Sequence, residues 1–149
     1  MRLAWLALGI AGFLIAADNP VGDAKKDLDR MQGSWEGTSG ESKGNAIPDE
    51  QLKETRFFVK GEKYSYKVGD TYQEEGTLKI DPTKKPKMID VTIVDGEDKG
   101  KTQLGIYEVT RDKLKLCFAP PGKEKTRPKD FSTNAGNQQL LLVLSREKS

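Results

Sequence analysis

Residues 33–35 read Gly33-Ser34-Trp35, and near the other end of the chain the apolar run at residues 140–145 is followed by Arg146. In a small antiparallel barrel, a tryptophan on the first strand can plug one end while an arginine from the last strand lies across its ring. Such a cation–π contact contributes about 0.5 to 2 kcal/mol. Trp35 and Arg146 therefore predict a closed barrel whose first and last strands meet, and both residues are expected to be structural.

Between these two residues, short runs of alternating apolar and polar side chains are separated by turn residues. We expect strands beginning at Trp35 and at residues 56–60, 63–68, 72–80, 88–94, 102–109, 113–118 and 140–145. Residues 38–45 are rich in Gly and Ser and are expected to leave the first strand, and residues 48–53 read as a brief helix with Pro48 at its start. Eight strands joined mostly by tight turns predict an all-β, up-and-down antiparallel barrel.

The alternation also predicts which side chains point into the barrel. The expected inward residues are Phe57, Val59, Tyr64, Tyr66, Val68, Leu78, Ile80, Ile89, Val91, Ile93, Leu114, Leu116 and Phe118. The strands at 102–109 and 140–145 are apolar on both faces, so residues 18–31 or 119–139 are expected to cover them outside. An eight-stranded barrel is either filled by its own side chains or wide enough for one small ligand, and the sequence leaves both alternatives open.

The chain divides into three parts. Residues 1–17 resemble a secretory signal peptide, because Arg2 precedes an uncharged apolar run at residues 3–15 and two small residues follow it. A retained anchor is the alternative, but a spanning helix needs about 20 apolar residues. Residues 18–31 form a polar lead-in with a short helix, in which Leu28 and Met31 could cover a barrel end, and residues 32–149 form the barrel. We therefore expect export to the periplasm or the medium.

Composition argues against several classes of function. The chain has 25 Lys and Arg against 23 Asp and Glu, so it has no bulk charge suited to nucleic acid or a membrane surface. It contains no histidine, which removes histidine-based nucleophile pairs and the commonest zinc ligand. We expect no enzyme activity, no cofactor, no metal and a monomer. Cys117 is the only cysteine, and it is either a reactive thiol or a small strand residue covered by a neighbouring element.

Several segments together resemble a known family. They are 31–35 (MQGSW), 76–78 (GTL), 81–86 (DPTKKP), 104–108 (LGIYE), 114–123 (LKLCFAPPGK), 127–131 (RPKDF) and 141–144 (LLVL). This pattern resembles an uncharacterised lipocalin-like domain family of planctomycete bacteria. The resemblance implies an exported lipocalin-like barrel without an established activity and without catalytic residues to transfer.

The polar residues expected inside the barrel point to ligand binding. An inner face rich in tyrosine offers ring area and hydroxyl groups, and Glu74 can orient a ligand by hydrogen bonding. The alternative is that Glu74 reaches water at the rim. The predicted ligand-binding residues are Tyr64, Tyr66, Tyr72, Glu74, Tyr107 and Phe118. We therefore expect a small, partly apolar ligand inside the barrel. The alternative is a protein- or glycan-interaction module that uses the outer surface and the loop at 119–139 around a filled interior.

Overall fold

The computed structural model describes residues 20–123 and 126–148, so the signal peptide expected at residues 1–17 lies outside the described residues. Within the described part, one helix precedes the sheet and a second, short helix follows its first strands. The elements are α2 (Pro20–Met31), β1 (Gly33–Ser42), β2 (Asn45–Ala46), α3 (Asp49–Glu54), β3 (Thr55–Lys60), β4 (Lys63–Val68), β5 (Thr71–Asp81), β6 (Lys87–Gly96), β7 (Thr102–Val109), β8 (Lys113–Phe118) and β9 (Leu140–Arg146).

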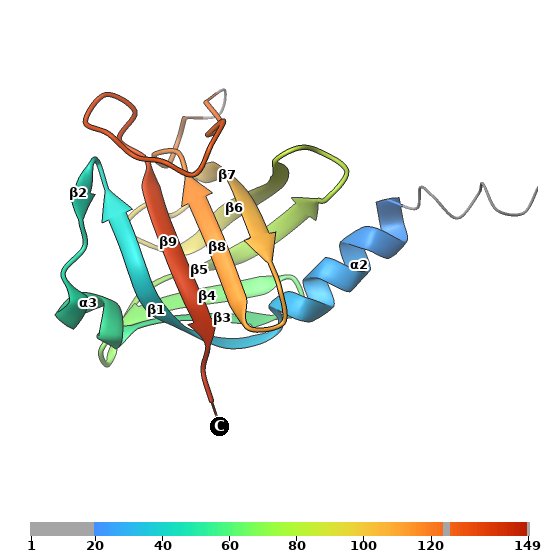
Figure 1. Ribbon diagram of the computed structural model, residues 1–149, viewed down its shortest axis with the longest axis horizontal. Helices are drawn as coiled ribbons and strands as arrows, with labels where there is room; N and C mark the ends of the chain where they lie inside the picture. Colours follow the sequence, from blue (N-terminus) through green and yellow to red (C-terminus); the bar gives the residue numbers. More distant parts are fainter. Residues whose placement is uncertain (1–19, 124–125, 149) are drawn as a thin grey trace, which may run out of the picture.

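Eight of the described strands close into an antiparallel barrel (Figure 1). The order is β1, β3, β4, β5, β6, β7, β8 and β9, and β9 pairs back onto β1, while the two-residue β2 pairs with the end of β1. Consecutive strands are neighbours except where α3 and β2 intervene, so the connection is up-and-down. The predicted all-β, lipocalin-like barrel with a short N-terminal helix is confirmed.

Four expected strands differ from the structure by one or two residues at an end, and the largest error is in the first strand. Strand β1 continues through Ser42, although residues 38–45 were expected to form a loop. Its second half pairs with β9, with Gly40 opposite Leu142 and Ser42 opposite Leu140. Closure of the barrel supplies this partner strand, and its backbone hydrogen bonds outweigh the weak strand preference of Gly and Ser.

The plug predicted from Trp35 and Arg146 is present at one end of the barrel. Trp35 is fully buried, and the guanidinium carbon of Arg146 lies 4.3 Å from the centroid of its ring. The two residues are directly opposite each other across the β1–β9 pair. Trp35 Nε1 also donates a hydrogen bond of 2.8 Å to the carbonyl of Met31, which ties the end of α2 to the plug.

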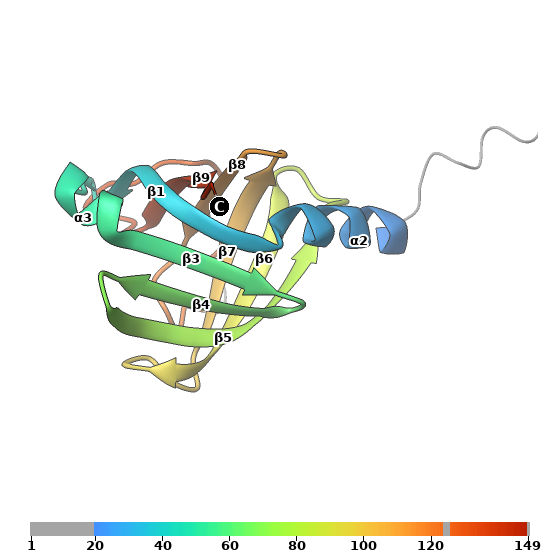
Figure 2. The same ribbon diagram turned by 90° about the horizontal axis from the view of Figure 1, so that it is seen from below.

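Helix α2 lies against the plugged end, and Figure 2 shows its first turns extending beyond the barrel. Met31 is fully buried and Leu28 packs against the core, as the lead-in pattern predicted. Asp27 is also buried, and its carboxylate accepts hydrogen bonds of 2.8 Å from the Tyr107 hydroxyl and the Lys87 ammonium group. The helix therefore closes this end with both an apolar and a polar contact.

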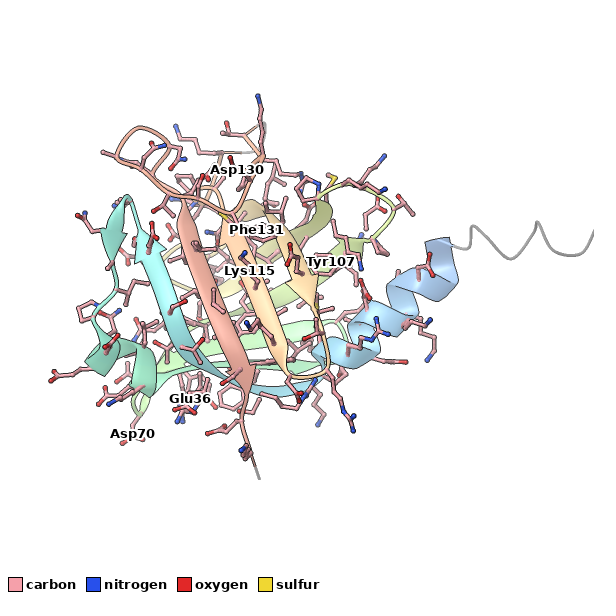
Figure 3. The ribbon with its side chains drawn as sticks, in the orientation of Figure 1. Glu36, Asp70, Tyr107, Lys115, Asp130 and Phe131 are labelled. Carbon is pink, nitrogen blue, oxygen red and sulfur yellow. The ribbon has the colours of Figure 1, made fainter. Side chains whose placement is uncertain are left out.

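The long connection between β8 and β9 covers part of the outer surface. The Lys115 ammonium group lies 4.6 Å from the ring centroid of Phe131, and Figure 3 shows these two side chains over β8. Cys117 is fully buried beneath the same connection, with its Sγ 3.6 Å from the Ser132 carbonyl oxygen. Cys117 is therefore the covered strand residue of the two alternatives, and burial raises the pKa of its thiol to about 11.

Candidate functional site

The barrel contains a cavity of about 350 Å³ at the end opposite the plug. Its wall is mostly apolar and is formed by Phe57, Tyr64, Tyr66, Glu74, Val91, Gln103, Leu116, Phe118, Leu140 and Leu142. The rim is formed by Ser42, Lys43, Ala119, Pro120, Pro121 and Gln138, from the end of β1 and the connection between β8 and β9. A volume in this range is sufficient for a small ligand, since pockets that bind such ligands begin at about 300 Å³.

Aromatic rings make up much of the wall. The rings of Phe57 and Tyr64 are stacked, with centroids 5.6 Å apart and an angle of 26° between their planes. Two of the aromatic rings each pack over a glycine on the neighbouring strand, where the absence of a Cβ atom makes room for the ring. A Cβ atom on Gly76 would lie 2.7 Å from the Tyr64 ring, and one on Gly105 would lie 2.5 Å from the Phe118 ring. Each ring packs directly over its opposite glycine, which fixes its orientation.

The principal polar group inside the cavity is a carboxyl–phenol pair. The Tyr64 hydroxyl donates a hydrogen bond of 2.8 Å to Oε2 of Glu74. Burial has the largest effect on Glu74 and raises the pKa of its carboxyl group, the hydrogen bond from Tyr64 opposes this, and the charge of Asp98 adds to it. Burial and the adjacent carboxylate raise the pKa of Tyr64 well above its ordinary value, so its phenol stays protonated and donates.

Four of the six predicted ligand-binding residues lie together on this wall: Tyr64, Tyr66, Glu74 and Phe118. Tyr72 does not, and its side chain is 60% exposed. The reason is a β-bulge, because Tyr66 pairs with Glu74 while the next residue, Lys67, pairs with Tyr72. Gln73 is the extra residue, so Tyr72 and Glu74 point to opposite faces despite their spacing of two. The Lys67 ammonium group lies 5.6 Å from the centroid of the Tyr72 ring, outside the barrel.

Tyr107 points inward, as predicted, but it is not part of the cavity wall. It is fully buried near the plugged end, and its hydroxyl donates to Asp27 of α2. Burial has the largest effect on this phenol too and, together with the Asp27 carboxylate, raises its pKa. The predicted role for Tyr107 as a ligand contact is corrected to a contact that holds the helix.

Sequence reasoning missed several wall residues as ligand contacts. Phe57 was expected inward, and the Gly61-Glu62 turn places it opposite Tyr66 in the β3–β4 hairpin, so its position on the wall could have been inferred. Gln103 lies two residues before Gly105 on the inward face of β7, and its Nε2 donates a hydrogen bond of 3.0 Å to the Ala119 carbonyl. The rim prolines have no comparable signal, because they belong to a connection without regular structure.

Within residues 20–123 and 126–148, no three His, Cys, Asp or Glu side chains gather as a metal site would require. None of the helices in that part is both long and apolar enough to span a membrane. Comparisons with protein-family models, curated proteins and solved structures found no match. The resemblance to a planctomycete lipocalin-like family stays a prediction.

Proposed function

We propose that this protein is an exported, non-enzymatic barrel that binds a small, partly apolar molecule in the cavity at its open end. The observation that carries this proposal is the cavity of about 350 Å³, whose apolar and aromatic wall contains one oriented carboxyl–phenol pair. Such a combination, with apolar area for affinity and few polar groups for orientation, is typical of small-molecule sites. Glu74 and Tyr64 are suited to orienting a ligand by hydrogen bonding.

The alternative, an interaction module with a filled interior, has less support. The interior is hollow at the open end. The loop that would contact a partner is also held against the barrel, because Phe131 packs over Lys115 and Arg127 forms an ion pair of 2.6 Å with Asp90. The described part of this loop is therefore better suited to bordering the cavity.

Fluorescence titration with N-phenyl-1-naphthylamine, a neutral apolar probe, tests the proposal. We expect saturable one-to-one binding by the wild type and a loss of about tenfold or more in affinity for Val91→Phe, because the added ring occupies the cavity. Val94→Phe is the matched control, since Val94 lies on the same strand with its side chain 53% exposed.

A second variant, Leu140→Trp, narrows the cavity from its mouth and covers the case in which Val91→Phe does not fold. Absence of saturable binding by the wild type, or equal binding by all variants that melt cooperatively, would refute the proposal. If binding is found, native mass spectrometry of protein purified from its own host would identify the ligand that accompanies it.

A further inference from the structure

We infer that the ligand carries a positively charged nitrogen, such as a primary ammonium group, next to an apolar body. This inference rests on the proposed function, because it specifies the chemistry of a ligand in the same cavity. It follows from the unbalanced charge of Glu74 and from the aromatic rings beside it.

Two carboxylates, Asp27 of α2 at the plugged end and Glu74 of β5 at the open end, can be compared directly. Asp27 at the plugged end accepts a hydrogen bond of 2.8 Å from Tyr107, and Glu74 at the open end accepts one of 2.8 Å from Tyr64. Asp27 additionally has two basic partners, the Lys87 ammonium group at 2.8 Å and the Arg30 guanidinium group at 3.4 Å. Among the described residues, no lysine or arginine forms an ion pair with Glu74.

Glu74 is half-buried, and partial withdrawal of a carboxylate from water without a cation has a cost that falls when a cation is brought to it. The Tyr64 hydroxyl occupies one position on Oε2, while a carboxylate has about four lone-pair sites, so acceptor capacity remains for a ligand. The phenol therefore orients the carboxylate without neutralising it.

The aromatic residues around Glu74 favour the same kind of group. Phe57, Tyr64, Tyr66 and Phe118 line the same cavity. Faces of aromatic rings attract cations, and they do so more strongly where water is excluded. A carboxylate and several rings in one cavity thus select for a cationic nitrogen and against an anion.

Lys43 is the one basic residue on the cavity lining among residues 20–123 and 126–148, and it could pair with an anionic ligand instead. It lies at the rim in the turn after β1, and it is exposed to solvent. An exposed ion pair contributes little, whereas an anion that extends inward would meet Glu74. The positions of the two charges therefore favour a cation inside the cavity.

Three probes of similar size separate these alternatives: 2-phenylethylamine, 2-phenylethanol and phenylacetate. Each is measured by displacement of N-phenyl-1-naphthylamine at about pH 8, where a carboxyl group is ionised and a primary amine is protonated. We expect the amine to bind about tenfold or more tightly than the alcohol, because a hydrogen bond between charged groups is stronger than one with a neutral donor. The anion should bind most weakly.

Glu74→Gln should remove the preference for the amine over the alcohol, with each affinity compared with that of the same variant for the neutral probe. Glu75→Gln is the matched control, because Glu75 is the next residue on β5 and its side chain is exposed. Equal affinities for amine and alcohol, a preference for the anion, or an unchanged amine preference in Glu74→Gln would overturn this inference while leaving the proposed function intact. Failure of the neutral probe to bind the wild type would instead refute the proposed function.

Discussion

Arg146 joins three parts of the chain at the plugged end, so its removal should be the most informative test of the fold. Its Nη1 and Nη2 donate hydrogen bonds to the carbonyls of Gln32 and Arg30, and its Nε donates one of 2.8 Å to the carbonyl of Arg111. Two of these carbonyls lie at the C-terminal end of α2, where the helix has no internal donors for them. The same guanidinium group lies over Trp35.

The expected loss in Arg146→Ala can be worked from these contacts. Three hydrogen bonds at a partly exposed position contribute about 1 kcal/mol each. The cation–π contact adds about 0.5 to 1 kcal/mol. Because the contacts share one side chain and are not fully additive, we expect the free energy of unfolding to fall by about 3 kcal/mol. For a domain of this size, that corresponds to a decrease in Tm of roughly 10 °C.

Urea unfolding followed by tryptophan fluorescence and circular dichroism measures this loss. The free energy of unfolding should fall about half as much in Arg146→Lys, because lysine retains the positive charge but not the planar guanidinium group that donates from three nitrogens. Arg111→Ala is the control, because it removes an exposed arginine side chain and keeps the carbonyl that accepts from Arg146. If the free energy of unfolding fell by less than about 1 kcal/mol in both Arg146→Ala and the control, the contacts of Arg146 would not hold the two ends of the chain together.

Two further predictions concern the half-buried Glu74 and the fully buried Cys117. The pKa of Glu74 is higher in the folded than in the unfolded protein, so the free energy of unfolding falls as the pH rises from the unfolded-state pKa through the folded-state pKa. Without ligand, Glu74→Gln should therefore unfold at a higher temperature than the wild type near neutral pH. Thermal melts at several pH values should show this difference in Tm vanishing below the ordinary carboxyl pKa of 4.5. An equal or lower Tm for Glu74→Gln at neutral pH would contradict this. Cys117, whose pKa is raised from 9.0 to about 11, should react with iodoacetamide about a hundredfold more slowly in the native protein than in urea at about pH 8, as mass spectrometry can follow. Equal rates would show that the connection over β8 does not shield the thiol.

Most strand boundaries could be predicted from the sequence because alternation and turn residues are local signals. Residues 63–68, 102–109 and 113–118 were predicted with the bounds that the structure has. The second half of β1 was missed because its strand character depends on pairing with β9, a partner about a hundred residues away. A Gly- and Ser-rich segment contains no local signal for such a contact.

The site was predicted in part, for a related reason. Alternation gives the face of a strand on which a residue lies, but it does not give the height of that residue along the barrel. Tyr107 faces inward and still belongs to the plugged end, where it meets Asp27. The inward position predicted for Tyr72 was wrong because of the bulge at Gln73, which reverses the inward–outward alternation at one position. The sequence contains no clear signal for this bulge.

The two ends of the barrel use similar groups for different purposes. At the plugged end, Asp27 has both a phenol and a cation as partners, and Trp35 has the guanidinium group of Arg146. At the open end, the phenol of Tyr64 donates a hydrogen bond to Glu74, and no lysine or arginine among the described residues forms an ion pair with it. Substitutions at Arg146 should therefore reduce stability without changing ligand affinity below the Tm, whereas Glu74→Gln should change ligand selectivity without reducing stability. If substitutions at Arg146 and Glu74→Gln each changed both the stability and the ligand binding of the protein, then stability and binding would not be separated between the two ends of the barrel.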